Sequence, residues 1–134
     1  LDDWAAEGVV EVAGPSSDIP TVYANADIAV LPSYREGLPK SLLEAAAAGL
    51  PLVATDVPGC REICRHAETG LLVPLKSTAP LADALERLAG DPALRAKFGA
   101  AARHAAETEF SEARVVADTL ALYDTLIANF VEHR

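Results

Sequence analysis

The chain has too few basic residues to offer a positively charged surface. Its 134 residues contain 11 Lys and Arg against 20 Asp and Glu, so the formal net charge is −9. Because nucleic acids and anionic membranes bind to positive surfaces, we expect neither of them as a general partner. Any phosphate group that this protein binds must therefore be held by a local arrangement of groups.

Long hydrophobic runs and methionine are also absent. No apolar run approaches the roughly 20 residues that span a bilayer, and no basic segment followed by an apolar one opens the chain, so we expect a cytoplasmic protein. The sequence begins at Leu1 and contains no methionine, and we expect a piece of a longer protein. With 51% hydrophobic residues, its length suits one domain, residues 1–134, with its own core.

Cysteine and histidine are scarce and poorly placed for a metal site. Cys60 and Cys64 are the only cysteines, and His66, His104 and His133 are scattered along the chain. A zinc site needs further ligands at matching spacing, and two neighbouring cysteines make no disulfide framework. We expect two buried or half-buried thiols, no metal and no catalytic histidine.

The first half of the chain alternates short apolar runs with helical patterns. The predicted strands cover residues 9–13, 28–32, 51–55 and 71–74, and the predicted helices cover residues 19–26, 39–48 and 59–66. Asp18 is a suitable N-cap for the first of these helices, after a loop at residues 14–18. This alternation predicts a parallel sheet with right-handed crossovers.

Three helical segments follow, at about residues 79–89, 92–108 and 111–131. Apolar residues recur at mainly helical spacing in the last segment, from Val115 to Phe130, which predicts a packed stripe. The predicted fold class is therefore α/β, a Rossmann-like parallel sheet with flanking helices and a C-terminal run of helices.

The stretch at residues 31–55, LPSYREGLPKSLLEAAAAGLPLVAT, places two carboxylates around one helix start. Glu36 lies in a loop after an apolar strand, Pro39 suits the first helical position, and Glu44 lies a turn and a half further on. Helical side chains lean toward the N-terminus, so both carboxylates can border the same mouth. Amides after Gly37 can hold a phosphate, while carboxylates there favour sugar hydroxyls; a nucleotide sugar offers both groups.

A simpler interpretation of Glu44 stays open. Lys40 lies four residues earlier on the same helix face, and the two side chains can form a solvated ion pair. Lys before Glu is the weaker orientation of such a pair, worth at most about 0.2–0.5 kcal/mol.

Several segments together resemble a known enzyme family. They are Glu36-Gly37, the spacing of seven residues between the two glutamates, LLEAAAAGLPLVAT, Pro58-Gly59 with Glu62, and the run from Thr69 to Pro74. This pattern resembles the donor-site signature of family-4 retaining glycosyltransferases of the GT-B fold. The resemblance covers nearly the whole chain and implies a partial C-terminal, nucleotide-sugar-binding domain.

The resemblance implies roles for particular residues. Glu36 would be the catalytic residue that binds hydroxyls of the transferred sugar, and Glu44 would bind the ribose hydroxyls. The backbone at Gly37, Leu38, Lys40 and Ser41 would face the sugar and the pyrophosphate. Many family members have glycine where this chain has Pro39, which has no N–H to donate.

The same resemblance places Ser16 and Ser17 near the nucleobase, although an ordinary turn explains them equally well. It also implies that the chain lacks the opening strands of its domain and the basic pair that faces the donor pyrophosphate. Arg35 and Lys40 are the nearest cations, and neither matches that pair. Without those strands an apolar sheet edge would be exposed, so we expect the fragment to self-associate.

The implied function is transfer of a hexose-type sugar from a nucleoside diphosphate sugar to an acceptor hydroxyl in glycan biosynthesis, without metal or cofactor. An acceptor glycan or lipid-linked acceptor would bind the missing N-terminal domain, and the fragment alone would be inactive. With a lipid-linked acceptor, the full-length protein would lie at the periphery of the inner membrane. Two alternatives remain: another GT-B enzyme such as a nucleotide-sugar epimerase, and a non-catalytic interaction module on the same scaffold.

Overall fold

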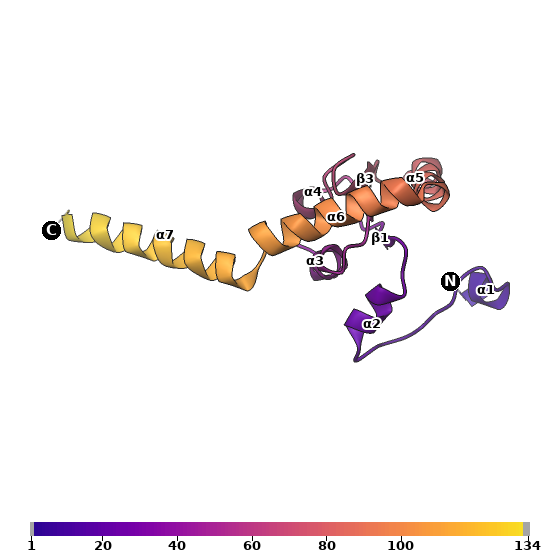
Figure 1. The fold of residues 1–134 in the computed structure, drawn as a ribbon, viewed down its shortest axis with the longest axis horizontal. Coiled ribbons are helices and arrows are strands. Elements are labelled where there is room, and N and C mark those ends of the chain that lie inside the picture. Colours follow the sequence, from indigo (N-terminus) through magenta and orange to yellow (C-terminus); the bar gives the residue numbers. More distant parts are fainter. Residues whose placement is uncertain (1, 133–134) are drawn as a thin grey trace.

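The structure is a computed structural model that describes residues 2–132 (Figure 1). The expectations stated above for Leu1 and His133 lie outside the described residues. The elements are α1 (Asp2–Ala6), α2 (Ile19–Ala24), β1 (Ala29–Leu31), α3 (Lys40–Ala47), β2 (Leu52–Thr55), α4 (Pro58–Ile63), β3 (Gly70–Val73), α5 (Thr78–Gly90), α6 (Pro92–Glu109) and α7 (Glu112–Glu132).

The three strands form one parallel sheet in the order β1-β2-β3. Val53 of the central strand lies opposite Val30 on one side and Leu71 on the other. All four residues of β2 are buried, as expected for a strand that is covered on both faces. The predicted α/β class and the parallel sheet are confirmed.

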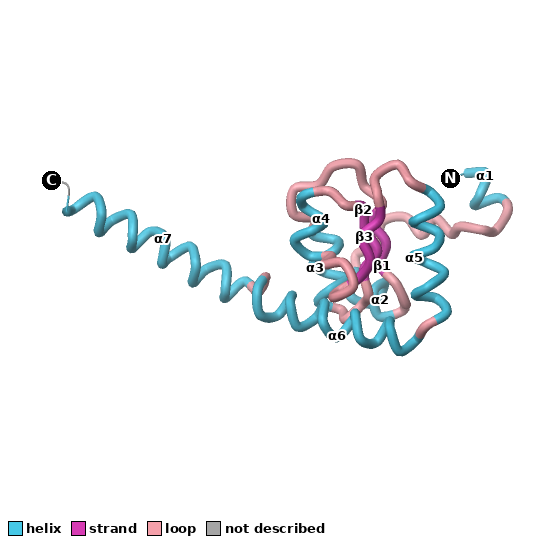
Figure 2. The backbone as a smooth tube through the Cα atoms, turned by 90° about the horizontal axis from the view of Figure 1, so that it is seen from above, coloured by secondary structure: helices cyan, strands magenta, loops and turns pink. Residues whose placement is uncertain are grey.

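Helices cover both faces of the sheet. Figure 2 shows α3 and α4 on one side of the strands, α5 on the other, and α6 crossing beside them. Leu42, Cys60 and Ile63 belong to the core cluster on the first side, whereas Leu88 and Phe98 belong to the cluster on the second. Gly99 lets α6 approach the chain before β2, because a Cβ there would lie 2.1 Å from the Gly49 carbonyl oxygen. Helix α6 therefore packs closely against the chain just before β2.

The predicted strand at residues 9–13 is wrong. This segment is irregular, and Val9 and Val12 are 70% and 64% exposed. Apolar alternation produces a strand only where a neighbouring strand can accept its hydrogen bonds. Among residues 2–132 the sheet has only the three strands named above, and none of them pairs with this segment.

The C-terminal helices match their predicted bounds to within a residue, but α7 does not pack as predicted. It extends away from the body of the molecule (Figures 1 and 2). Its apolar side chains are half exposed or more, including Val115, Leu120 and Ile127 at 54%, 56% and 62%. The prediction of a packed stripe is thus wrong for the described side chains. No helix among the described residues is long and apolar enough to span a bilayer.

Candidate functional site

The candidate site lies where the chain leaves the carboxyl end of β1 and enters α3. In proteins with an open parallel sheet, ligands bind in the crevice outside the carboxyl ends of the strands. The connecting loop is fixed to the neighbouring strand, because the Thr55 hydroxyl at the end of β2 donates a hydrogen bond to the Ser33 carbonyl. Thr55 is 4% exposed, so this anchor is shielded from water.

Gly59 in α4 fixes the same loop from the other side. A Cβ on Gly59 would lie 1.7 Å from the Gly37 carbonyl oxygen and 2.8 Å from that of Glu36. The backbone of α4 and the backbone that carries Glu36 are therefore in direct contact, which only glycine permits. The sequence pointed to Gly59 only as part of a family pattern, and its contact with Glu36-Gly37 was not foreseen.

Helix α3 starts one residue later than predicted. Pro39 is the N-cap, with φ −70° and ψ 113°, and its carbonyl accepts hydrogen bonds from the amides of Leu42 and Leu43. An extended N-cap carries no helical amide, so a residue without N–H costs nothing there. The corner between β1 and α3 contains four amides that donate no hydrogen bond to another described residue: those of Gly37, Leu38, Lys40 and Ser41. They are free to bind an anion.

The Glu36 side chain is half-buried and lies toward α4. Its negative charge adds to burial in raising the pKa of the Cys60 thiol. Cys60 and Cys64 are both buried free thiols, as predicted, and burial raises the pKa of Cys64 to about 12. Neither thiol is placed to act as a nucleophile, because a buried thiol with a raised pKa stays protonated at neutral pH.

Glu44 lies toward α2 and has the ion pair that the simpler interpretation expects. Its carboxylate is 3.4 Å from the Lys40 ammonium, with the two side chains 36% and 85% exposed. Burial and the Glu44 charge together raise the pKa of Tyr23, whose hydroxyl donates to the Ser41 carbonyl at 3.0 Å. An exposed pair of this kind holds Glu44 weakly, so Glu44 remains able to bind a ligand.

Glu44, but not Glu36, lines cavities on either side of α3. Glu44 lines a cavity of about 450 Å³ between α2 and α3 and another of about 430 Å³ between α3 and the end of α6. Glu36 lines neither of them. The structure thus brings Lys40, Ser41 and Glu44 together on α3, and Glu36 with Gly37 at α4. A mouth bordered by both glutamates stays a prediction.

Ser16 and Ser17 lie in the loop before α2. The Ser16 hydroxyl accepts a hydrogen bond from the Asp18 amide at 3.1 Å, and the Asp18 carboxylate caps α2 through the Thr21 amide at 3.2 Å. The predicted N-cap is confirmed, and the turn explains Ser16. The nucleobase role of both serines stays a prediction. Among residues 2–132, no three His, Cys, Asp or Glu side chains are grouped to hold a metal ion.

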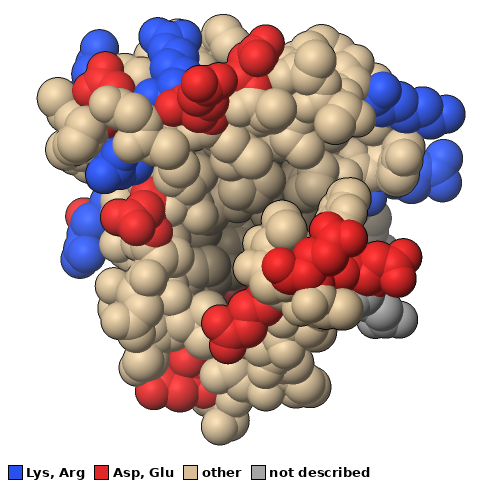
Figure 3. All heavy atoms as spheres, turned by 90° about the vertical axis from the view of Figure 1, so that its right-hand side faces the viewer, with Lys and Arg blue, Asp and Glu red and all other residues tan. Residues whose placement is uncertain are grey.

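Charge is distributed in small groups over the surface. The face drawn in Figure 3 shows separate acidic and basic side chains with uncharged surface between them. Four of the seven described arginines have carboxylate partners, such as Arg65, whose two terminal guanidinium nitrogens donate to Glu109 at 2.9 and 2.5 Å. Recognition of a phosphate therefore depends on local donors.

Comparison with known proteins places these residues in a family. The family model described as glycosyl transferases group 1 matches residues 5–105. An exopolysaccharide phosphotransferase from Streptomyces coelicolor is 43% identical over 121 residues, which are 89% of this chain and 13% of that protein. An N,N'-diacetylbacillosaminyl-diphospho-undecaprenol alpha-1,3-N-acetylgalactosaminyltransferase from Campylobacter jejuni is 38% identical over 129 residues, 95% of this chain and 34% of that one.

A solved structure gives the same result. The HepE protein of Anabaena, in complex with UDP, superposes with a TM-score of 0.81 at 25% identity, over 95% of this chain and 34% of that protein. The chain thus spans about a third or less of the length of these proteins.

Proposed function

Because the chain belongs to the group 1 glycosyl transferases, we propose that it is the part of a retaining glycosyltransferase that binds the nucleoside diphosphate sugar donor. Its fold is a partial C-terminal domain of the GT-B type, as the resemblance predicted. The observation that carries the proposal is the corner between β1 and α3. Four unpartnered amides lie there, on residues that stand between Glu36 and Glu44 in the sequence.

The corner offers two kinds of group that a nucleotide sugar needs. The free amides and the positive end of α3 suit the diphosphate, and would stabilise the charge that develops on it as the sugar leaves. Glu36 would accept hydrogen bonds from the transferred sugar and Glu44 from the ribose. Catalysis would then consist of positioning and electrostatic stabilisation, without a nucleophile from the protein.

Further parts of the proposal concern the whole protein. We propose a hexose-type donor sugar and an acceptor in glycan biosynthesis, with the acceptor bound by residues beyond this chain and no cofactor required. The name of the Campylobacter relative specifies a sugar acceptor on diphospho-undecaprenol, which supports a lipid-linked acceptor. Such an acceptor would place the full-length protein in the cytoplasm at the inner membrane, and the fragment alone would not transfer sugar.

Isothermal titration of the chain with UDP tests the donor site. Hydrogen bonds to a charged group contribute about 1.5–3 kcal/mol, so Glu44→Ala should weaken UDP binding by roughly ten- to a hundredfold if Glu44 holds the ribose. Lys40→Ala should leave the affinity within about threefold, because it removes only the exposed ion pair.

Asp118→Ala is the matched control. Asp118 forms the same kind of i,i+4 pair, with Arg114 at 2.8 Å, on α7, which extends away from the body of the molecule (Figure 1). An unchanged dissociation constant in Glu44→Ala would contradict the ribose role and favour the surface pair. Loss of binding in Asp118→Ala as well would show that the variants act through folding.

A further inference from the structure

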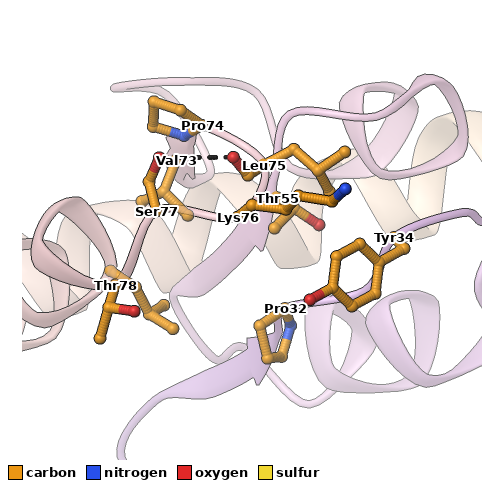
Figure 4. Close-up of a pocket in the computed structure, with 10 residues that line it drawn as sticks. Pro32, Tyr34, Thr55, Val73, Pro74, Leu75, Lys76, Ser77 and Thr78 are labelled. Carbon is orange, nitrogen blue, oxygen red and sulfur yellow. Dashed lines mark hydrogen bonds between the residues drawn. The ribbon is translucent and has the colours of Figure 1, made fainter.

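A further cavity opens at the carboxyl ends of the strands, on the α5 side of the sheet. Its volume is about 330 Å³. Its wall includes Pro32 and Tyr34 after β1, Thr55 at the end of β2, and Lys76, Ser77 and Thr78 between β3 and α5 (Figure 4). Neither Glu36 nor Glu44 lines it. It is therefore separate from the corner proposed to bind the donor.

Lys76 supplies the only charge in the wall of this cavity. The described residues that line it include no Asp, Glu or Arg. Asp56, which directly follows the lining residue Thr55, is bound by Arg61. Among the described residues Lys76 has no carboxylate partner, in contrast to Lys40 with Glu44. A chain with a net charge of −9 thus keeps one uncompensated cation at this point.

The Lys76 side chain is held over the cavity. Figure 4 shows it reaching from the loop after β3 toward Tyr34 in the loop after β1. The ammonium lies 5.9 Å from the centroid of the Tyr34 ring, within the range of a cation–π contact. This contact leaves the ammonium able to donate hydrogen bonds, because it uses no acceptor atom.

The backbone at Lys76 lies in the left-handed region. Its φ is +58°, a value that glycine and asparagine adopt far more readily than lysine. Ala67 adopts the same region with φ +62°, so this conformation belongs to the turn and does not by itself mark a functional side chain. A variant at Lys76 must therefore keep a residue that accepts this backbone.

Hydroxyl groups complete the set of donors. The Ser77 hydroxyl is engaged with the Leu75 carbonyl at 3.3 Å, and Thr55 with Ser33, so these two shape the wall. The hydroxyls of Tyr34 and Thr78 make no hydrogen bond to another described residue and can turn toward a ligand. A lysine with neighbouring hydroxyls and no carboxylate suits an oxyanion.

We propose that this cavity binds a phosphate group, with the Lys76 ammonium as its main partner. Its volume lies at the lower end of the range of about 300–1,000 Å³ for ligand pockets, which leaves room for a small organic group on the phosphate. Free phosphate and a sugar phosphate share this chemistry. The proposal does not depend on the donor site, since different residues form the two sites.

The test is a titration of the ¹⁵N-labelled chain, followed by NMR at constant ionic strength, with inorganic phosphate and with glucose 1-phosphate. We expect saturable shifts in the amides of Leu75, Lys76 and Thr78 with at least one of them. Tighter binding of glucose 1-phosphate would identify a sugar phosphate as the ligand, and equal binding would identify the phosphate itself. Glucose alone should cause no shift.

Two variants decide the role of Lys76. Lys76→Asn removes the charge but keeps a residue that accepts the left-handed backbone, and it should weaken binding about tenfold or more. Lys97→Gln removes the same charge from an exposed position on α6 and should bind like the unchanged protein. Shifts that do not saturate, that centre on residues 37–41, or that persist unchanged in Lys76→Asn would overturn the proposal.

Discussion

Gly59→Ala should damage both the stability and the donor site of this protein. The new Cβ would lie 1.7 Å from the Gly37 carbonyl oxygen, whereas Cβ atoms essentially never approach a heavy atom within 3.0 Å. The atoms that must separate are backbone atoms on both sides. Helix α4 is held by Cys60 and Ile63, which are 0% and 2% exposed, and the loop is held by Thr55.

The magnitude follows from overpacking at a rigid contact. Inserting a methyl group into a well-packed site costs about 1–3 kcal/mol, and the upper part of that range applies where backbone cannot rotate away. Alanine gains back up to about 1 kcal/mol of helix propensity in α4. We therefore expect Gly59→Ala to lower the free energy of unfolding by about 1–2 kcal/mol, measured by urea denaturation followed by circular dichroism.

Gly90→Ala is the matched control, because no atom lies within 4 Å of a Cβ built at the end of α5. It should be neutral or stabilising by up to about 1 kcal/mol. In ¹⁵N spectra, Gly59→Ala should shift the amides of residues 36–38 and weaken UDP binding, while Gly90→Ala should do neither. Full stability together with unshifted amides in Gly59→Ala would refute the contact and its role in placing Glu36.

Three further predictions concern the core, the thiols and the free sheet edge. Phe98 is 1% exposed and fills the core on the α5 side of the sheet. Phe98→Ala should lower the free energy of unfolding by about 3–5 kcal/mol in urea denaturation. A loss below about 1 kcal/mol would contradict the packing of Phe98. Burial raises the pKa of Cys64 from 9.0 to about 12, so the folded state holds this proton more tightly than the unfolded state. The stability that results is fully present below pH 9 and is lost between pH 9 and about 12. The free energy of unfolding should therefore fall more from pH 8 to pH 11 in the unsubstituted protein than in Cys64→Ala. Equal losses in the two proteins would contradict the raised pKa of Cys64. The exposed apolar segment at residues 9–13 and the unpaired edge of β1 should make the chain self-associate, and a monomer by light scattering at high concentration would contradict this.

Local signals predicted most of the sheet and its helices. Glycine and proline at residues 49 and 51 separate α3 from β2, and the apolar run that follows has the length of a buried strand. These features act within a few residues, so the bounds of the three strands and of α2 and α3 were correct to within one or two positions, whereas α4 ends at Ile63, three residues before its predicted end. The segment at residues 9–13 and the stripe on α7 failed for a shared reason. Apolar periodicity indicates that a face can be buried, but not which segment would bury it.

The site was predictable in its residues but not in its contacts. The spacing of Glu36 and Glu44 and the amides between them follow from one continuous stretch of sequence. The approach of Gly59 to Gly37 joins residues that lie 22 positions apart, and the cavity beneath Lys76 joins the ends of all three strands. Contacts of this kind depend on the packing of separate elements, which no local pattern encodes.

The most direct test of the donor-site proposal is a crystal structure of the full-length protein with a bound nucleoside diphosphate sugar. We predict the ribose hydroxyls within hydrogen-bond distance of Glu44, the transferred sugar at Glu36, and the diphosphate on the amides of residues 37–41. A nucleotide bound elsewhere, with both carboxylates facing solvent, would contradict it.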